Sequence, residues 1–149
     1  MTTADVLKRP TPGPSRDYRF PAFERLTLTN GVRVVVAPVS KLPIATVVAM
    51  VDAGAAADPR GQEGVALLTA RALAEGTQRN DGAELAARFE RLGTALDASA
   101  DWDSATLRIT VTSERLPAAL GLLAEVIRVP SFPEREVERL RQERLAELR

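Results

Sequence analysis

The chain has 149 residues, of which 45% are hydrophobic and 27% charged, a composition typical of one globular domain rather than of a disordered segment. Twenty basic residues balance twenty acidic ones, so the net charge gives no reason to expect nucleic acid or an anionic membrane as a partner. The absence of cysteine and histidine excludes disulfides, thiol chemistry and the commonest zinc ligand.

Residues 1–22 contain four prolines, Pro10, Pro12, Pro14 and Pro21, and are expected to form an extended or disordered lead-in. They lack the apolar segment of a signal peptide, and no apolar run in the chain is long enough for a membrane span. We therefore expect a soluble protein, with the compartment left open between bacterial cytoplasm and periplasm.

The pattern along the rest of the chain predicts alternating groups of strands and helices. Asn30-Gly31 lies between two β-branched or alternating runs, which predicts a hairpin with a type I′ turn. Strands are expected at residues 26–29, 32–36, 44–51, 94–100 and 105–111. Helices are expected at residues 65–75, 82–92 and 115–128, and a last one opens at residues 131–134. This order predicts an α+β fold with a mostly antiparallel sheet backed by helices.

The last helix is expected to begin with Ser131 as its N-cap and Pro133 in its first turn. Its many Glu and Arg residues predict a solvent-exposed face with i,i+4 ion pairs. The chain ends inside this helical pattern, so we expect a longer parent protein.

Asp97, Asp101 and Asp103 surround a turn between two expected strands, for which a plain acidic turn is favoured over a metal site. Trp102 in the same turn is a candidate contact residue.

One expected helix contains a residue that does not suit a protein core. The stretch GVALLTARALAEGT, residues 64–77, is almost wholly apolar, yet Arg71 lies near its middle. A permanent cation in such a helix needs either solvent or a negatively charged partner.

Several short segments, taken in order, resemble the insulinase/pitrilysin-like metallopeptidases, the family that includes mitochondrial processing peptidase. These segments are LTNGVRVV (28–35), DAG (52–54), GVA (64–66), EGT (75–77), RLG (91–93), LGLLAEVI (120–127) and PSFPE (130–134). The resemblance covers residues 23–149. It implies the first part of the N-terminal domain of such a peptidase, a partial domain of the metallohydrolase fold.

The resemblance also implies where a zinc site would lie. Active members carry His-x-x-Glu-His on the helix that begins at the Gly-x-Ala step. Here the two histidine positions fall on Leu67 and Arg71, and the general-base position falls on Ala70. The family spacing places the third ligand at Glu147, while a supporting glutamate position falls on Leu140. Because Leu and Ala have no lone pair and a guanidinium repels a cation, we expect no catalytic residue, no bound metal and no cofactor, although active members use zinc.

Two interpretations of Arg71 stay open. In one, its stem packs in the core while its charged head reaches solvent. In the other, Arg71 and Glu147 form an ion pair where zinc lies in active relatives, and Arg71→Leu then strongly destabilises the fold if the pair is buried.

The resemblance therefore implies a catalytically silent homologue, an accessory or substrate-binding subunit for an active zinc peptidase of the same family, with a peptide or unfolded polypeptide as substrate. Two alternatives remain: an active zinc metalloendopeptidase with displaced ligands, and a purely structural assembly subunit like the core subunits of the bc1 complex. A homodimer formed through an open sheet edge is also possible.

Overall fold

The computed structural model describes residues 13–15 and 17–149, which fall into two compact units divided between Leu42 and Pro43. Each unit is described by itself. The lead-in expected at residues 1–22 falls largely outside the described residues, so that expectation stays a prediction.

The first unit contains a β-hairpin of β1 (Glu24–Thr27) and β2 (Arg33–Val36). The hairpin was predicted, but its turn type was wrong. Gly31 has a positive φ of 86°, whereas among the described non-glycine residues only Phe132 has a positive φ. The Gly31 N–H donates to the Leu28 carbonyl, and the Leu28 N–H donates to the Val32 carbonyl. These bonds define a three-residue loop that ends in a left-handed glycine. The turn is not of type I′, because that type requires a positive φ at Asn30 as well as at Gly31, and Asn30 has none.

The second unit is built on an antiparallel sheet of β3 (Ile44–Val51), β5 (Ala105–Thr112) and β4 (Asp97–Ala100), in the order β3-β5-β4. Side chains of β5 alternate, so Leu107, Ile109 and Val111 are buried on the face toward the helices.

Strand β4 begins three residues later than the 94–100 expected from the sequence. The N–H groups of Gly93 and Thr94 donate to the carbonyls of Glu90 and Phe89, which ends the preceding helix. These residues therefore belong to the helix terminus and not to the strand.

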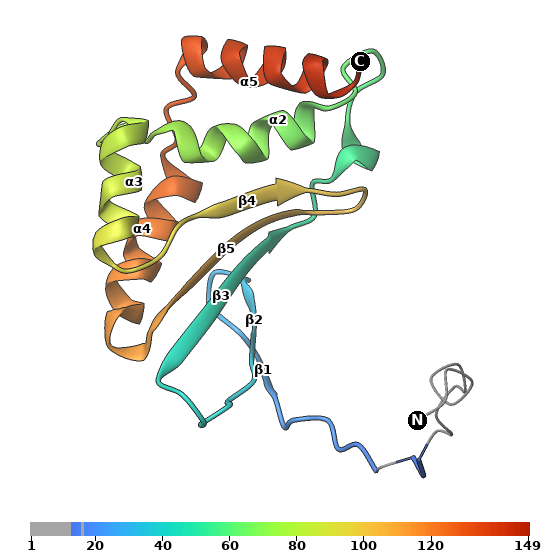
Figure 1. Cartoon of the computed structure of the whole chain (residues 1–149), viewed down its shortest axis with the longest axis vertical. Coiled ribbons are helices and arrows are strands. Elements are labelled where there is room, and N and C mark those ends of the chain that lie inside the picture. The colour runs from blue at the N-terminus through green and yellow to red at the C-terminus, as the bar shows by residue number, and fades with distance from the viewer. Residues whose placement is uncertain (1–12, 16) are drawn as a thin grey trace, which may run out of the picture. The chain divides into compact units, whose positions relative to one another are not determined.

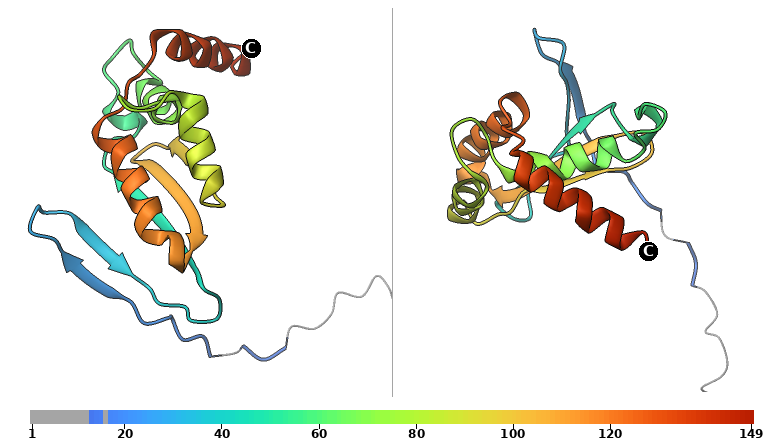
Figure 2. Two further views of the ribbon diagram at one scale, coloured as in Figure 1. Left: turned by 90° about the vertical axis from the view of Figure 1, so that its left-hand side faces the viewer. Right: turned by 90° about the horizontal axis from the view of Figure 1, so that it is seen from above.

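Four α-helices complete this unit (Figure 1). They are α2 (Val65–Ala72), α3 (Gly82–Arg91), α4 (Leu116–Arg128) and α5 (Glu134–Glu147). Helices α2 and α4 pack on the sheet, and α5 packs along α2, as the views in Figure 2 also show. The buried core joins α3, α4 and β5, and its members are Leu85, Phe89, Leu107, Ile109, Val111, Ala119, Leu122, Leu123 and Val126. The α+β class with antiparallel strands and a helical layer is as predicted.

Two helix boundaries differ from the prediction. The last turn expected in the first helix tightens into a 3-10 helix, η2 (Leu73–Glu75). Ser131 is not the N-cap of α5, because the cap residue is Pro133 and its side chain makes no capping bond. The Ser131 N–H instead donates to the Gly76 carbonyl, which ties the α4–α5 link to the loop after η2.

A buried carboxylate fixes that loop. The Glu125 side chain on α4 is only 8% exposed. Its oxygens accept hydrogen bonds from Thr77 Oγ1 and Asn80 Nδ2, both at 2.7 Å, and from Arg88 Nη1 at 3.4 Å. The hydrogen bond from Thr77 contributes most to holding the pKa of Glu125 below its usual value despite burial. The hydrogen bond from Asn80 and the positive charge of Arg88 act in the same direction. The segment 76–81 is thus anchored by one charged acceptor.

We predict that Glu125→Gln lowers the free energy of unfolding at neutral pH by about 1–3 kcal/mol, because it removes a charged acceptor from buried donors. Since the folded pKa is lowered, this contribution is present above the unfolded pKa and is lost as pH falls through the folded pKa. Urea unfolding at a series of pH values measures the difference, with the exposed Glu114→Gln as control. If the free energies of unfolding of Glu125→Gln and the parent differed by the same amount at every pH, this role of Glu125 would be contradicted.

Candidate functional site

Helix α2 carries the candidate site, and its start is fixed by a residue from the preceding loop. Asp58 accepts hydrogen bonds from the N–H groups of Gly64 (2.6 Å) and Ala66 (2.8 Å). These N–H groups have no partner within the helix, so the carboxylate satisfies and stabilises them. Gly64, the residue at the normal cap position, has a left-handed φ of 102°. Sequence reasoning missed Asp58 because it lies well upstream of that position.

The three predicted motif positions on α2 have different environments. Ala70 is buried, Leu67 is half-buried, and the Arg71 side chain is 32% exposed. Leu67 and Arg71 are one turn apart and therefore share a face of the helix. Leu140, at the predicted supporting-glutamate position on α5, is buried.

Arg71 is paired with Glu147 of α5, as one of the two interpretations predicted. Arg71 Nη1 lies 3.1 Å from Glu147 Oε1, and Nη2 lies 3.5 Å from Oε2. Arg144 Nη1 donates to the same Oε2 at 2.9 Å. Arg144 foremost, and then Arg71, lower the pKa of Glu147. One carboxylate thus lies between two guanidinium groups.

The pair is not buried, because the Glu147 side chain is 44% exposed. The condition under which a large loss of stability was expected is therefore not met. A partly exposed pair is screened by water and salt, so its contribution is small even with good geometry.

A second ion pair joins α5 to η2, the short helix that continues from α2. Arg139 Nη2 of α5 lies 2.7 Å from Glu75 Oε1 of η2. The two pairs have opposite polarity. In the first pair the cation, Arg71, lies on α2, and the anion lies on α5. In the second pair the anion, Glu75, lies on η2, and the cation, Arg139, lies on α5. An α5 docked in the reverse direction would bring like charges together. The charges are therefore complementary in the observed antiparallel direction of α5 along α2 and would not be in the reverse direction.

The charged face of α5 was predicted to contain i,i+4 pairs, but most of its pairs have i,i+3 spacing. These are Glu136–Arg139, Glu138–Arg141 and Arg144–Glu147, whereas only Arg139–Glu143 among the described residues is i,i+4. In addition, Arg139 and Glu147 reach across to η2 and α2, which a single-helix pattern does not indicate.

The residues at the site do not fit a zinc ion. Leu67 and Ala70 offer no donor atom, and Arg71 places a positive charge at the other predicted ligand position on α2. Among the described residues, no group of three or more His, Cys, Asp or Glu is arranged to hold a metal. No helix in the described part of the chain has the length and hydrophobicity of a membrane span.

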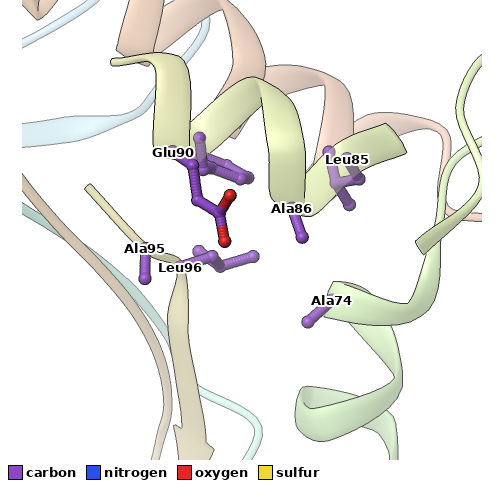
Figure 3. A pocket seen from close by; sticks show the side chains of 7 residues that line it. Ala74, Leu85, Ala86, Glu90, Ala95 and Leu96 are labelled. Atoms are coloured by element: carbon purple, nitrogen blue, oxygen red, sulfur yellow. The ribbon is translucent and has the colours of Figure 1, made fainter. Parts of the chain in front are cut away.

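A small pocket lies elsewhere, between α3, η2 and the residues before β4 (Figure 3). Its volume is about 130 Å³, and it is lined by Ala74, Leu85, Ala86, Phe89, Glu90, Ala95 and Leu96. Glu90 points toward the gap between the two sides. One carboxylate in an otherwise apolar pocket of this size offers no paired acid and base, so it is not a second catalytic candidate.

We predict that the Arg71–Glu147 pair contributes a small, salt-sensitive coupling to stability. A double-mutant cycle of Arg71→Leu and Glu147→Gln, followed by thermal unfolding, should give a favourable coupling in low salt that disappears in molar NaCl. Because the Glu147 pKa is lowered, the coupling should persist above the unfolded carboxylate pKa and vanish as pH falls through the folded value. Arg141→Leu is the control on the outer face. A coupling energy that does not change with salt would contradict the interpretation that the Arg71–Glu147 pair is exposed to solvent.

The chain has recognisable relatives. Residues 33–149 match the family described as insulinase, peptidase family M16. Subunit 1 of the mitochondrial cytochrome b-c1 complex of Bos taurus is 29% identical over 121 residues, covering 81% of this chain and 25% of that protein. The beta subunit of the mitochondrial-processing peptidase of Mus musculus is 27% identical over 137 residues, covering 92% of this chain and 28% of that protein.

A solved structure is also similar. The crystal structure of a peptidase M16 inactive domain from Pseudomonas fluorescens superposes with a TM-score of 0.78 at 30% identity, covering 84% of this chain and 31% of that chain. The chain thus spans about a quarter of the length of the curated relatives it matches. The matched segment includes α2, η2 and α5 and so contains the Arg71–Glu147 site. By this match over most of its length and by its fold, the chain belongs to the insulinase family of peptidases, family M16.

Proposed function

We propose that this chain is a catalytically silent member of the M16 family that acts as an accessory or substrate-binding subunit for an active zinc peptidase. The main support for this proposal comes from helix α2, where Leu67, Ala70 and Arg71 occupy the positions predicted for the zinc motif. The one remaining carboxylate, Glu147, is held by Arg71 and Arg144. A similar structure described as an inactive M16 domain supports the proposal.

The names of two relatives support a role in an assembly, since both are subunits. The relative from the cytochrome b-c1 complex specifically favours a second candidate, a structural assembly subunit without a link to proteolysis. The third candidate, an active peptidase with displaced ligands, is disfavoured because the chain has no histidine or cysteine to replace the missing ligands.

A co-purification experiment distinguishes the first two candidates. The tagged chain should bring down an M16 protein that carries His-x-x-Glu-His, and adding the chain to that partner should raise its peptidase activity. The Arg71→Leu variant should bind the partner equally well if Arg71 serves only the fold. Association with a complex that contains no such peptidase would instead favour the structural role.

The assignment of the motif positions can be tested by restoring them. A variant with Leu67→His, Ala70→Glu and Arg71→His should bind zinc in a 1:1 ratio, measured by plasma mass spectrometry after dialysis, while the parent should not. Adding Glu147→Gln to this variant should weaken zinc binding, because it removes the predicted third ligand. A folded triple variant that takes up no zinc would refute the mapping of these positions.

A further inference from the structure

At one end of the sheet, two loops are joined by backbone hydrogen bonds. The N–H groups of Ala55 and Ala56, in the 3-10 helix η1 (Ala55–Ala57), donate to the carbonyls of Asp101 and Trp102 at 2.9 Å each. A Cβ on Gly54 would lie 2.5 Å from the Trp102 carbonyl oxygen, so the approach requires glycine. In Figure 1, η1 lies beside the turn that joins β4 to β5.

Asp101 makes this turn rigid. Its carboxylate accepts hydrogen bonds from the N–H groups of Asp103 (3.0 Å) and Ser104 (2.8 Å) and from the Ser104 hydroxyl (3.2 Å). The bonds from Ser104 and then Asp103 lower the pKa of Asp101. This carboxylate therefore caps the turn.

The rigid turn presents an exposed aromatic side chain. Trp102, the only tryptophan in the chain, is 70% exposed. At the same end of the sheet, β3 ends with Met50, which is 69% exposed, and Val51, which is 45% exposed. A tryptophan held on a fixed backbone loses little conformational entropy on binding, which is why this residue type is enriched at the centres of interfaces.

All charges on the two joined segments have the same sign. Residues 51–58 and 97–104 contain five aspartates and neither lysine nor arginine. Asp58 and Asp101 act as caps, which leaves three exposed aspartates: Asp97 at the start of β4, Asp52 just after β3, and Asp103 in the β4–β5 turn. An exposed indole face next to carboxylates is an environment that favours a cation, through both ion pairing and the cation–π interaction.

We propose that this end of the sheet, comprising Trp102, Met50, Asp52 and Asp103, is a docking surface for a basic polypeptide segment. An arginine or lysine of that segment stacks on Trp102, its charge is balanced by Asp52 and Asp103, and a neighbouring apolar side chain covers Met50. The surface is distinct from the Arg71–Glu147 pair. Its test needs no peptidase, so the two proposals can fail independently.

The single tryptophan makes the test direct. Fluorescence of the whole chain is titrated with an extended peptide of alternating Arg and Leu, and with a matched peptide of alternating Glu and Leu. The basic peptide should shift the emission to shorter wavelength in a saturable way, and 0.5 M NaCl should weaken this binding about tenfold or more. The acidic peptide should give no shift.

Two variants locate the interaction. Asp52→Asn with Asp103→Asn should weaken binding of the basic peptide at least fivefold while leaving the free emission unchanged. Glu114→Gln with Glu134→Gln, which removes the same charge from exposed positions on other elements, should bind like the parent. Trp102→Phe, followed by peptide anisotropy, should also weaken binding.

Three results would overturn the proposal. One is an equal response to both peptides, which indicates contact through apolar groups alone. Another is equal weakening by the two double variants, which indicates a general charge effect. A third is an emission shift that follows protein concentration without peptide, which assigns the surface to a second copy of the chain.

Discussion

The contact between α5 and α2 includes an ion pair, in which Glu147 of α5 faces Arg71 of α2. The Glu147 carboxylate pairs with two guanidinium groups, that of Arg71 from α2 and that of Arg144 from α5. Together with the oppositely oriented pair between Glu75 and Arg139, this contact makes the charges of α5 complementary to those of α2 and η2 in the observed direction. Because the contact is charged and partly exposed, its strength depends on salt and pH rather than on buried area. Arg71, which forms this contact, is also one of the three residues that make the predicted motif positions unsuited to zinc.

The position of α2 depends in turn on polar contacts that lie outside the helix. Asp58 binds the N–H groups at its start, and the buried Glu125 anchors the loop that follows η2. Each is a single carboxylate that accepts hydrogen bonds from several donors in a loop or at a helix start. The core formed by α3, α4 and β5 supplies the apolar contacts against which these elements pack. A site of this kind combines a rigid apolar base with a few charged contacts that set its geometry.

The sequence predicted most of the fold because hydrophobic periodicity and glycine positions are local signals. It placed β3, β5, α3 and α4 to within about one or two residues, and it identified Arg71 and Glu147 as possible partners through family spacing. It misplaced the start of β4 because the Gly93–Thr94 backbone completes a helix terminus. It also misassigned Ser131, whose backbone joins a loop distant in sequence. Such partners are set by tertiary packing, as are the roles of Asp58 and Glu125, so no pattern along the chain reveals them.

The central claim is that Glu147, at the position proposed for a zinc ligand, faces a guanidinium. Its most direct test is an NMR titration of the Glu147 side-chain carboxyl, in the parent and in Arg71→Leu, with and without equimolar zinc. We predict a pKa below the ordinary glutamate value in the parent, a higher pKa in Arg71→Leu, and no effect of zinc on either titration curve. An ordinary pKa that Arg71→Leu leaves unchanged, or a zinc-induced shift of the parent resonance, would contradict the account.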